Sequence, residues 1–183
     1  MPLTPPEGEA TRPITDRAKQ SLFDALQDCF AMDGGGVVLD CFAGTGSLGL
    51  ECLSRGAAKA IFVERDRSAL AGLRENIQKL GVLEQAVVLP IDAYLAAENA
   101  EVRNLTVAFV DPPYSHTDTG HQRHKVDTLI RALAEGCMVD GGIISFRHPV
   151  NVSVDADVLG VKVVREFQYG EMGITWLAKR DSA

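Results

Sequence analysis

The most chemically informative residues of this sequence are four in a row, Asp111-Pro112-Pro113-Tyr114. They follow an apolar run, 105–110, that predicts a buried strand, so we expect them at one rim of a sheet. The prolines stiffen the turn and offer carbonyl acceptors without competing N–H donors. A planar amine could donate its hydrogens to Asp111 and a proline carbonyl while its ring stacks on Tyr114. The pattern favours methyl transfer to an exocyclic amino group of a nucleobase or an amide, although Asp-Pro-Pro is also an ordinary turn signal.

A glycine-rich loop follows the first expected strand, 37–41. Gly44, Gly46 and Gly49 match G-x-G-x-x-G, and Glu64 stands 20 residues after Gly44, at the end of the second expected strand. This is also the pattern of a dinucleotide-binding fold, in which the acid binds the ribose hydroxyls. The loop therefore predicts either a nicotinamide-dependent oxidoreductase or an S-adenosylmethionine-dependent methyltransferase.

Asp40 favours the methyltransferase. It ends its strand four residues before the first glycine, where the polar chain of the ligand must run. A carboxylate there repels the pyrophosphate of a dinucleotide but attracts the ammonium and sulfonium groups of S-adenosylmethionine. The glycines would then let the backbone approach the nucleoside closely.

Acidic residues also stand at the carboxyl ends of the next two expected strands: Asp92 follows the third, and Asp111 ends the fourth. The carboxyl ends of parallel strands line the ligand crevice of an open α/β sheet. Asp92, or the N–H of Ala93, could read the adenine amino group. Each acid alone is more often a helix cap, but together with the glycine loop they favour a cofactor site. The predicted cofactor residues are Asp40, Phe42, Ala43, Gly44, Thr45, Gly46, Glu64, Arg65, Asp92, Ala93 and Asp111.

Strand and helix patterns alternate along most of the chain, which predicts an α/β fold with a mostly parallel sheet and helices on both faces. The last two strand patterns are too close for a helix between them, so they predict an antiparallel C-terminal hairpin. The expected helices are 14–30, 47–55, 68–80, 93–100 and 126–135; the expected strands are 37–41, 59–64, 86–91, 105–111, 142–147, 161–168 and 173–179. Residues 1–13 contain four prolines and predict an extended arm ahead of a single domain, 14–183.

Composition narrows the functional classes. The 183 residues are 46% hydrophobic and 23% charged, which is typical of a globular protein. No apolar run approaches the roughly 20 residues that span a bilayer, and the start lacks a signal-peptide pattern, so we expect a cytoplasmic protein. The four cysteines form no CxxC pair, and His116, His121 and His124 fit no common zinc spacing, so we expect no metal. The net charge of −7 argues against indiscriminate nucleic-acid binding.

Two longer motifs make the chain resemble the RsmD family of 16S ribosomal RNA guanine-N2 methyltransferases. They are Thr-Arg-Pro-Ile-Thr-Asp-Arg at 11–17 and Leu-Asp-Cys-Phe-Ala-Gly-Thr-Gly-Ser-Leu-Gly-Leu-Glu at 39–51. The resemblance implies a Rossmann-like seven-stranded sheet, S-adenosyl-L-methionine as donor with S-adenosyl-L-homocysteine as product, and a guanine of small-subunit ribosomal RNA as substrate. We expect a monomer that acts on a small-subunit particle.

The same resemblance suggests which residues contact the substrate. Asp111, Pro112, Pro113 and Tyr114 would be catalytic, and Tyr114 would also stack on the base. Arg12, Thr15 and Arg17 are candidate RNA contacts, although a solvated helix start explains the two arginines equally well.

Three alternatives stay open. The substrate could be an adenine in DNA or RNA, or a protein glutamine, although enzymes of the last kind more often carry Asn where Asp111 stands. The chain could also be a non-catalytic, cofactor-binding assembly factor, or the oxidoreductase that Asp40 disfavours.

Overall fold

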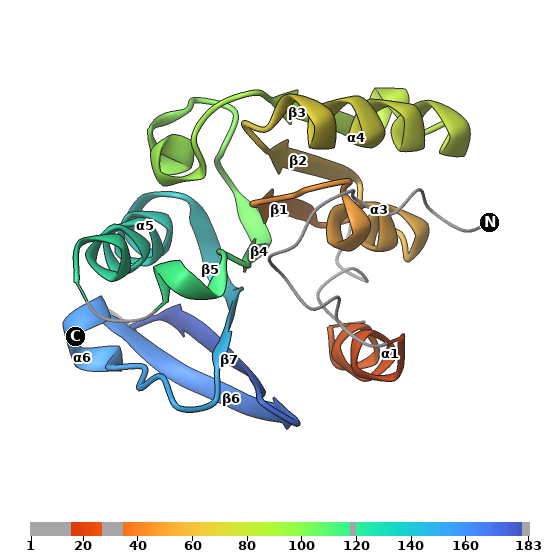
Figure 1. Cartoon of the computed structure of the whole chain (residues 1–183). Helices are drawn as coiled ribbons and strands as arrows, with labels where there is room; N and C mark the ends of the chain where they lie inside the picture. Colours follow the sequence, from red (N-terminus) through yellow and green to blue (C-terminus); the bar gives the residue numbers. More distant parts are fainter. Residues whose placement is uncertain (1–15, 27–34, 118–119, 181–183) are drawn as a thin grey trace.

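The computed structural model describes residues 16–26, 35–117 and 120–180, and its centre is a sheet of seven strands (Figure 1). Their order is β3-β2-β1-β4-β5-β7-β6. Strands β1 to β5 run parallel, and β7 lies antiparallel between β5 and β6. This confirms the Rossmann-like sheet with a closing antiparallel hairpin. The strands are β1 Val37–Cys41, β2 Lys59–Val63, β3 Ala86–Leu89, β4 Leu105–Val110, β5 Met138–Pro149, β6 Val161–Tyr169 and β7 Met172–Lys179.

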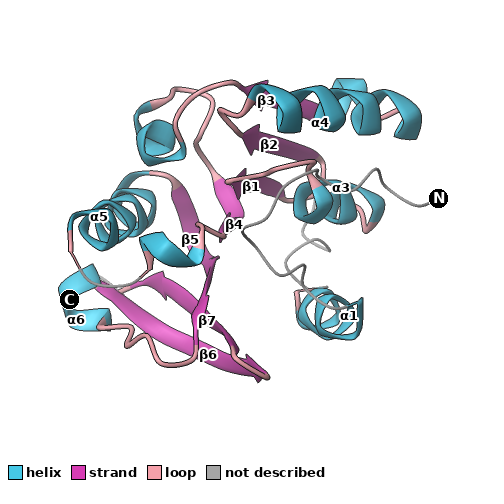
Figure 2. Ribbon diagram, in the orientation of Figure 1, coloured by secondary structure: helices cyan, strands magenta, loops and turns pink. Residues whose placement is uncertain are grey.

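Helices cover both faces of the sheet (Figure 2). One layer contains α1 Asp16–Ala25, α3 Ser47–Ser54 and α4 Arg67–Leu80. The other contains α5 His121–Gly136, α6 Ala156–Leu159 and the 3-10 helix η2 Ala93–Glu98. Two further 3-10 turns are η1 Leu83–Gln85 and η3 Tyr114–His116. Within the described ranges, no helix has both the length and the apolar character that crossing a bilayer requires.

The alternation of side chains along the central strands separates the two layers of the core. Val38 packs with α1, α3 and α4, whereas Leu39 and Cys41 pack with α5 and η2. All six residues of β4 are buried, as expected for a central parallel strand covered on both sides. Burying a side chain such as Phe109 contributes about 1.5–3 kcal/mol, so this strand is a rigid support for the residues that follow it.

The structure differs from the sequence-based expectations mainly at element ends. Helix α5 begins at His121 instead of 126, because its polar first turns carry no apolar period yet are supported by an ion pair between Arg123 and Asp127, 2.7 Å apart. The expected helix 93–100 is a shorter 3-10 helix. Helix α6 was not expected; Asp155 caps it and Gly160 ends it at φ 68°. The predicted arm 1–13 lies outside the described residues.

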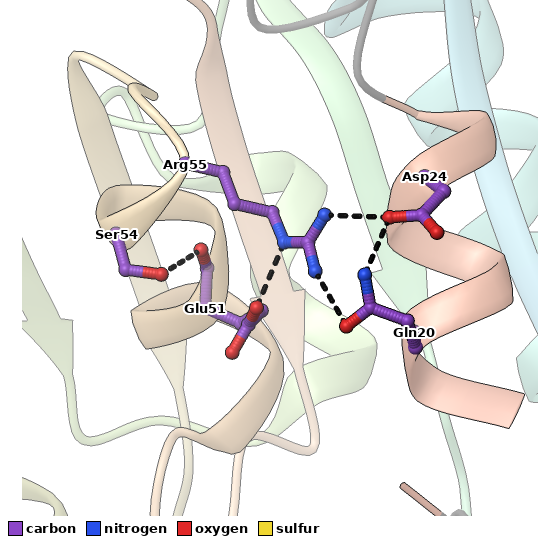
Figure 3. Close-up of polar contacts among 5 residues, drawn as sticks. All are labelled: Gln20, Asp24, Glu51, Ser54 and Arg55. Atoms are coloured by element: carbon purple, nitrogen blue, oxygen red, sulfur yellow. Dashed lines mark hydrogen bonds and ion pairs between the residues drawn. The ribbon is translucent and has the colours of Figure 1, made fainter. Parts of the chain in front are cut away.

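One arginine fixes α1 against α3 (Figure 3). Arg55, which directly follows α3, donates to Glu51 of that helix at 2.8 Å, and to Asp24 and Gln20 of α1 at 3.1 and 3.3 Å. Its guanidinium also lies 5.2 Å from the centroid of the Phe23 ring. The contact holds α1 beside the carboxyl end of β4.

Candidate active site

Four acidic residues stand at the carboxyl ends of neighbouring strands. Asp92, Glu64 and Asp111 follow β3, β2 and β4, and Asp40 is the last residue but one of β1; these strands are adjacent in the order β3-β2-β1-β4. The row that the sequence predicted therefore exists in the fold. The four carboxylates differ, however, in what holds them and in where they point.

The three glycines of the loop have different tasks. A Cβ at Gly46 would lie 2.4 Å from Leu73, and one at Gly49 would lie 2.4 Å from the Phe62 ring, so both glycines let α3 pack closely on β2 and α4. A Cβ at Gly44 would have no neighbour within 4 Å. Only Gly44, with φ 55°, borders open space where a ligand could approach the backbone. Gly46 and Gly49 thus have a packing role, and the expected contact of the loop with the nucleoside stays a prediction.

The rest of the loop is a tight turn. Gly46 donates its N–H to the Ala43 carbonyl at 2.8 Å, and the Thr45 carbonyl accepts from the Asn76 amide at 3.1 Å. Phe42 adopts φ 63°, a left-handed conformation that is strained for a bulky residue, and its ring packs edge-on against Tyr94 with centroids 5.5 Å apart. These bonds fix the shape of the turn before any ligand binds.

Glu64 is oriented by the backbone. One carboxylate oxygen accepts the Gly44 N–H at 2.9 Å, and the other accepts those of Arg65 and Asp66 at 2.7 and 2.8 Å. A carboxylate has about four lone-pair sites, so three bonds leave acceptor capacity for a further donor. Glu64 thus lies beside the open side of the glycine loop, in a position that suits a ribose hydroxyl.

Asp92 is both a helix cap and a strand-end acid. Its Oδ1 accepts the Tyr94 N–H at 3.2 Å, and its Oδ2 pairs with Arg65 at 2.8 Å. The pair joins the loops after β2 and β3. Ala93, the other predicted adenine contact, is buried. Burial, with a contribution from the charge of Asp92, raises the pKa of Tyr94 to about 12.

Asp40 is buried beside α3, and its expected direct contact with the ligand stays a prediction. The alternation along β1 turns this side chain toward α3, where it is only 2% exposed and accepts the Gly49 N–H at 2.9 Å. Gly46, the N-cap of α3, has no side chain to cap the helix, so Asp40 supplies that acceptor from the neighbouring strand. In this position Asp40 shapes the glycine loop through its bond to the start of α3.

Asp111 is the exceptional carboxylate. Its Oδ2 lies 2.8 Å from Arg147 of β5, whereas its Oδ1 is buried and has no hydrogen-bond partner among the described residues. The strand register explains the pair, because Val110 faces Phe146 and the next residues of both strands follow side by side. Burial raises the pKa of Asp111, and Arg147 opposes that rise.

The turn after Asp111 is held by its own carbonyls. The Pro113 carbonyl accepts the His116 N–H at 2.8 Å, and the Tyr114 carbonyl accepts from Thr117. The Pro112 carbonyl accepts no hydrogen bond within the part of the chain that the structure describes. It is therefore the better second acceptor for an amine.

An apolar depression opens beside Asp111 on the α1 and α3 side of the sheet. Asp111 and Arg147 are the charged members of its lining, and Ser145 is the polar one. The other lining residues are Leu22, Leu48, Phe109 and Ile174. A flat ring with a polar edge suits such a space, since the walls bury its faces and the charged pair meets its edge.

Other candidate residues have different outcomes. Arg12 and Thr15 lie outside the described residues, and Arg17 lies in α1 with no described side chain. Arg147 was missed, although a charge at the end of the apolar strand pattern 142–147 was the available signal. Among the described residues no cluster of His, Cys, Asp and Glu could hold a metal, and the ring of His116 lies 2.8 Å from the Tyr94 hydroxyl.

Several curated relatives resemble the chain, and two of them show how far the similarity extends. YlbH of Bacillus subtilis (strain 168), named provisionally as an rRNA methyltransferase, is 34% identical over 176 residues, which cover 94% of this chain and 90% of that protein. Ribosomal RNA small subunit methyltransferase D of Escherichia coli (strain K12) is 38% identical over 112 residues, 61% of this chain and 54% of that protein.

Solved structures agree on the fold. The Escherichia coli protein yhhF, named provisionally as a methyltransferase, superposes with a TM-score of 0.78 at 29% identity, covering 97% of this chain and 91% of that one. An RNA methyltransferase from Salinibacter ruber, solved with S-adenosyl-L-homocysteine, superposes with a TM-score of 0.66 at 14% identity, covering 94% and 97%. A family model described as Conserved hypothetical protein 95 matches residues 1–178. The resemblance found in the sequence is thereby confirmed, and the chain belongs to this family, the RsmD family.

Proposed function

We propose that this chain transfers a methyl group from S-adenosylmethionine to the exocyclic N2 amino group of a guanine in small-subunit ribosomal RNA. The observation that carries the proposal is the buried Oδ1 of Asp111, an acceptor with no partner among the described residues, at the edge of an apolar depression. The names of the Bacillus subtilis and Escherichia coli relatives support ribosomal RNA as the substrate.

The residues at the ends of β1 to β3 fit the proposed cofactor. The open space at Gly44 would let a nucleoside lie next to the backbone. Glu64 has acceptor capacity for the ribose hydroxyls, and Asp92 with the N–H of Ala93 would read the adenine edge. S-adenosylmethionine would supply an electrophilic methyl group, and the strand-end row would direct it toward Asp111.

Asp111 and Pro112 would activate the amine. The lone pair of an exocyclic nitrogen is delocalised into the ring, which makes the nitrogen a poor nucleophile. Hydrogen bonds from its two N–H groups to Asp111 Oδ1 and the Pro112 carbonyl would localise that pair and stabilise the positive charge that grows during transfer. The product ammonium is acidic enough to release its proton to water, so Asp111 need not be a strong base.

Tyr114 would hold the base. A target base must leave its helix to reach this rim, at a cost of a few kcal/mol of unstacking. Stacking on an aromatic ring returns about 1–3 kcal/mol. The guanidinium of Arg147 lies 5.5 Å from the centroid of the Tyr114 ring, so the ring has a support on one face.

The carboxylate favours guanine over adenine. Guanine carries the N1–H donor beside its N2 amino group, so this edge offers Asp111 donors only. Adenine carries the N1 acceptor beside its N6 amino group, and a carboxylate repels an acceptor. An asparagine amide could pair with both kinds of edge, whereas an ionised aspartate could accept only from the N6 amino group of adenine and would leave its N1 acceptor unmatched.

Methyl transfer to isolated ribosomal particles tests the proposal. Small subunits from a strain that lacks this protein would be incubated with the purified chain and tritiated S-adenosylmethionine, and the labelled nucleosides would be identified. N2-methylguanosine is expected. N6-methyladenosine would instead support the adenine alternative. Absence of label, with S-adenosylhomocysteine still bound in calorimetry, would support a non-catalytic assembly factor.

A further inference from the structure

Arg147 contacts both groups on which the proposed chemistry depends. It lies in β5, is 7% exposed, and places its guanidinium 2.8 Å from Asp111 Oδ2. The same guanidinium lies over the ring of Tyr114, with 5.5 Å to the centroid. Arg147 also lines the apolar depression beside Asp111.

The need for a cation follows from burial. A carboxylate removed from water favours its protonated form unless a positive charge lies next to it. The depression is lined otherwise by Ser145 and apolar side chains from α1, α3, β4 and β7. Within this described lining, Arg147 is therefore the one charge that can keep Asp111 ionised.

Ionisation decides what Asp111 can do. As a carboxylate it accepts hydrogen bonds on every lone pair, which suits an amine that approaches with its hydrogens. As a carboxylic acid it carries one O–H donor, which competes with that amine. The bond to Oδ2 also fixes the carboxylate plane, so Oδ1 keeps one direction.

We propose that Arg147 is a positioning residue: it holds Asp111 as a carboxylate with Oδ1 directed at the target amine, and it supports the plane of Tyr114 for stacking. The inference rests on the proposed function and deepens it. If the ion pair were merely structural, its loss would lower stability and would reduce activity by the same factor at every pH. The two roles thus differ in the pH dependence of transfer.

The pH dependence of kcat/KM tests the role. Arg147→Met removes the charge, so the pKa of Asp111 rises and a larger fraction is protonated at any given acidic pH. The acid limb of the profile moves to higher pH, with at least a tenfold loss at about pH 6 and a smaller loss at about pH 9. Arg147→Lys keeps the charge and restores the position of the acid limb, although kcat stays several-fold lower because lysine lacks the rigid fork of arginine.

Arg55→Met is the matched control. Arg55 also makes ion pairs and lies over an aromatic ring, that of Phe23, but it does not face Asp111. This variant loses stability without moving the acid limb. If Arg147→Met fails to fold by circular dichroism, Arg147→Gln replaces it, since the amide keeps a hydrogen bond to Asp111 without the charge. The acid limb of the Arg147→Gln profile must also move to higher pH. An acid limb at the same pH as that of the parent protein would overturn the inference.

A measurement without substrate separates this inference from the proposed function. The carboxyl carbon of Asp111 is followed by carbon-13 NMR across the pH range, with Asp111→Asn used to assign the signal. We expect the midpoint of the Asp111 titration to move to higher pH in Arg147→Met and to stay unchanged in Arg55→Met. A rise without methyl transfer by any variant would refute the proposed function but keep the ionising role. Transfer with an unmoved midpoint would overturn the inference and keep the function.

Discussion

The two halves of the strand-end row hold their carboxylates in different ways. On the β1 to β3 side, each acid accepts at least one backbone N–H: Asp40 from Gly49, Glu64 from Gly44 and its own turn, and Asp92 from Tyr94. On the β4 side, Asp111 is held by the side chain of Arg147. The first arrangement is set by the path of the chain, whereas the second depends on one side chain.

The two ion pairs of the row also differ in exposure, whereas Asp40 on the β1 side is itself only 2% exposed. The side chains of Arg65 and Asp92 are 66% and 34% exposed, whereas those of Arg147 and Asp111 are 8% and 20% exposed. Water weakens a charge interaction near the surface and leaves it strong in the interior. We infer that the half held by the backbone binds a ligand with little rearrangement, and that the buried pair of Arg147 and Asp111 controls the protonation state of a reacting group.

The largest effect is expected at Asp111. In Asp111→Ala the amine loses its charged acceptor, and removing one such preorganised group typically costs about 100- to 1000-fold in kcat. Affinity for S-adenosylhomocysteine stays within about twofold, because the ends of β1 to β3 keep their backbone bonds. A methyl-transfer assay and calorimetry on the same sample measure both quantities. Turnover close to that of the parent would refute the role of Asp111.

The second-largest effect is expected in the half of the row that the backbone holds, at the ends of β1 to β3. Glu64→Gln replaces a charged acceptor of ribose hydroxyls, and a hydrogen bond to a charged group contributes about 1.5–3 kcal/mol. We therefore expect the Kd for S-adenosylhomocysteine to rise about tenfold or more, with kcat restored at saturating cofactor. Glu75→Gln, on the exposed face of α4 where Glu75 pairs with Lys79, is the control. Equal weakening in both variants would contradict a ribose contact.

Most of the scaffold and half of the site could be predicted from the sequence. The strand patterns at 37–41 and 105–110 match β1 and β4, because short runs buried on both faces have a strong apolar signal. The acids at 64, 92 and 111 could be located, since the carboxyl ends of parallel strands meet at one edge. Helix α6 was missed because its four residues are too few for an apolar period.

The remaining features depend on distances that a sequence does not contain. Asp40 was assigned to the ligand because it ends a strand, but the two-residue alternation of β1 turns it toward α3. Arg147 was not predicted, because its role comes from the adjacency of β4 and β5, which are 27 residues apart along the chain between Asp111 and Met138. Local sequence patterns thus do not reveal which strands lie next to each other in the sheet.

A smaller effect should separate the ring of Tyr114 from its hydroxyl. In Tyr114→Ala the stacking surface is lost, which is worth about 1–3 kcal/mol, so KM for the ribosomal particle rises about tenfold. Tyr114→Phe keeps the ring and its contact with Arg147, and stays within about twofold of the parent. Steady-state kinetics with small subunits as the varied substrate measure the pair. The same loss in both variants would assign the effect to the hydroxyl.

The smallest effect is expected at the exposed counterpart of Arg147. Arg65→Met breaks the pair with Asp92, but an exposed ion pair contributes about 0–1 kcal/mol, and the backbone N–H of residue 65 still donates to Glu64. We expect Tm to fall by about 2 °C or less, and cofactor affinity to change less than it does in Glu64→Gln. Thermal unfolding of Arg65→Met and Arg147→Met in low and high salt tests the contrast. High salt should reduce the difference in Tm between Arg65→Met and the parent. The difference in Tm between Arg147→Met and the parent should stay the same, because a buried pair is screened far less. Equal salt dependence in the two variants would mean that burial is not what separates the two halves of the site.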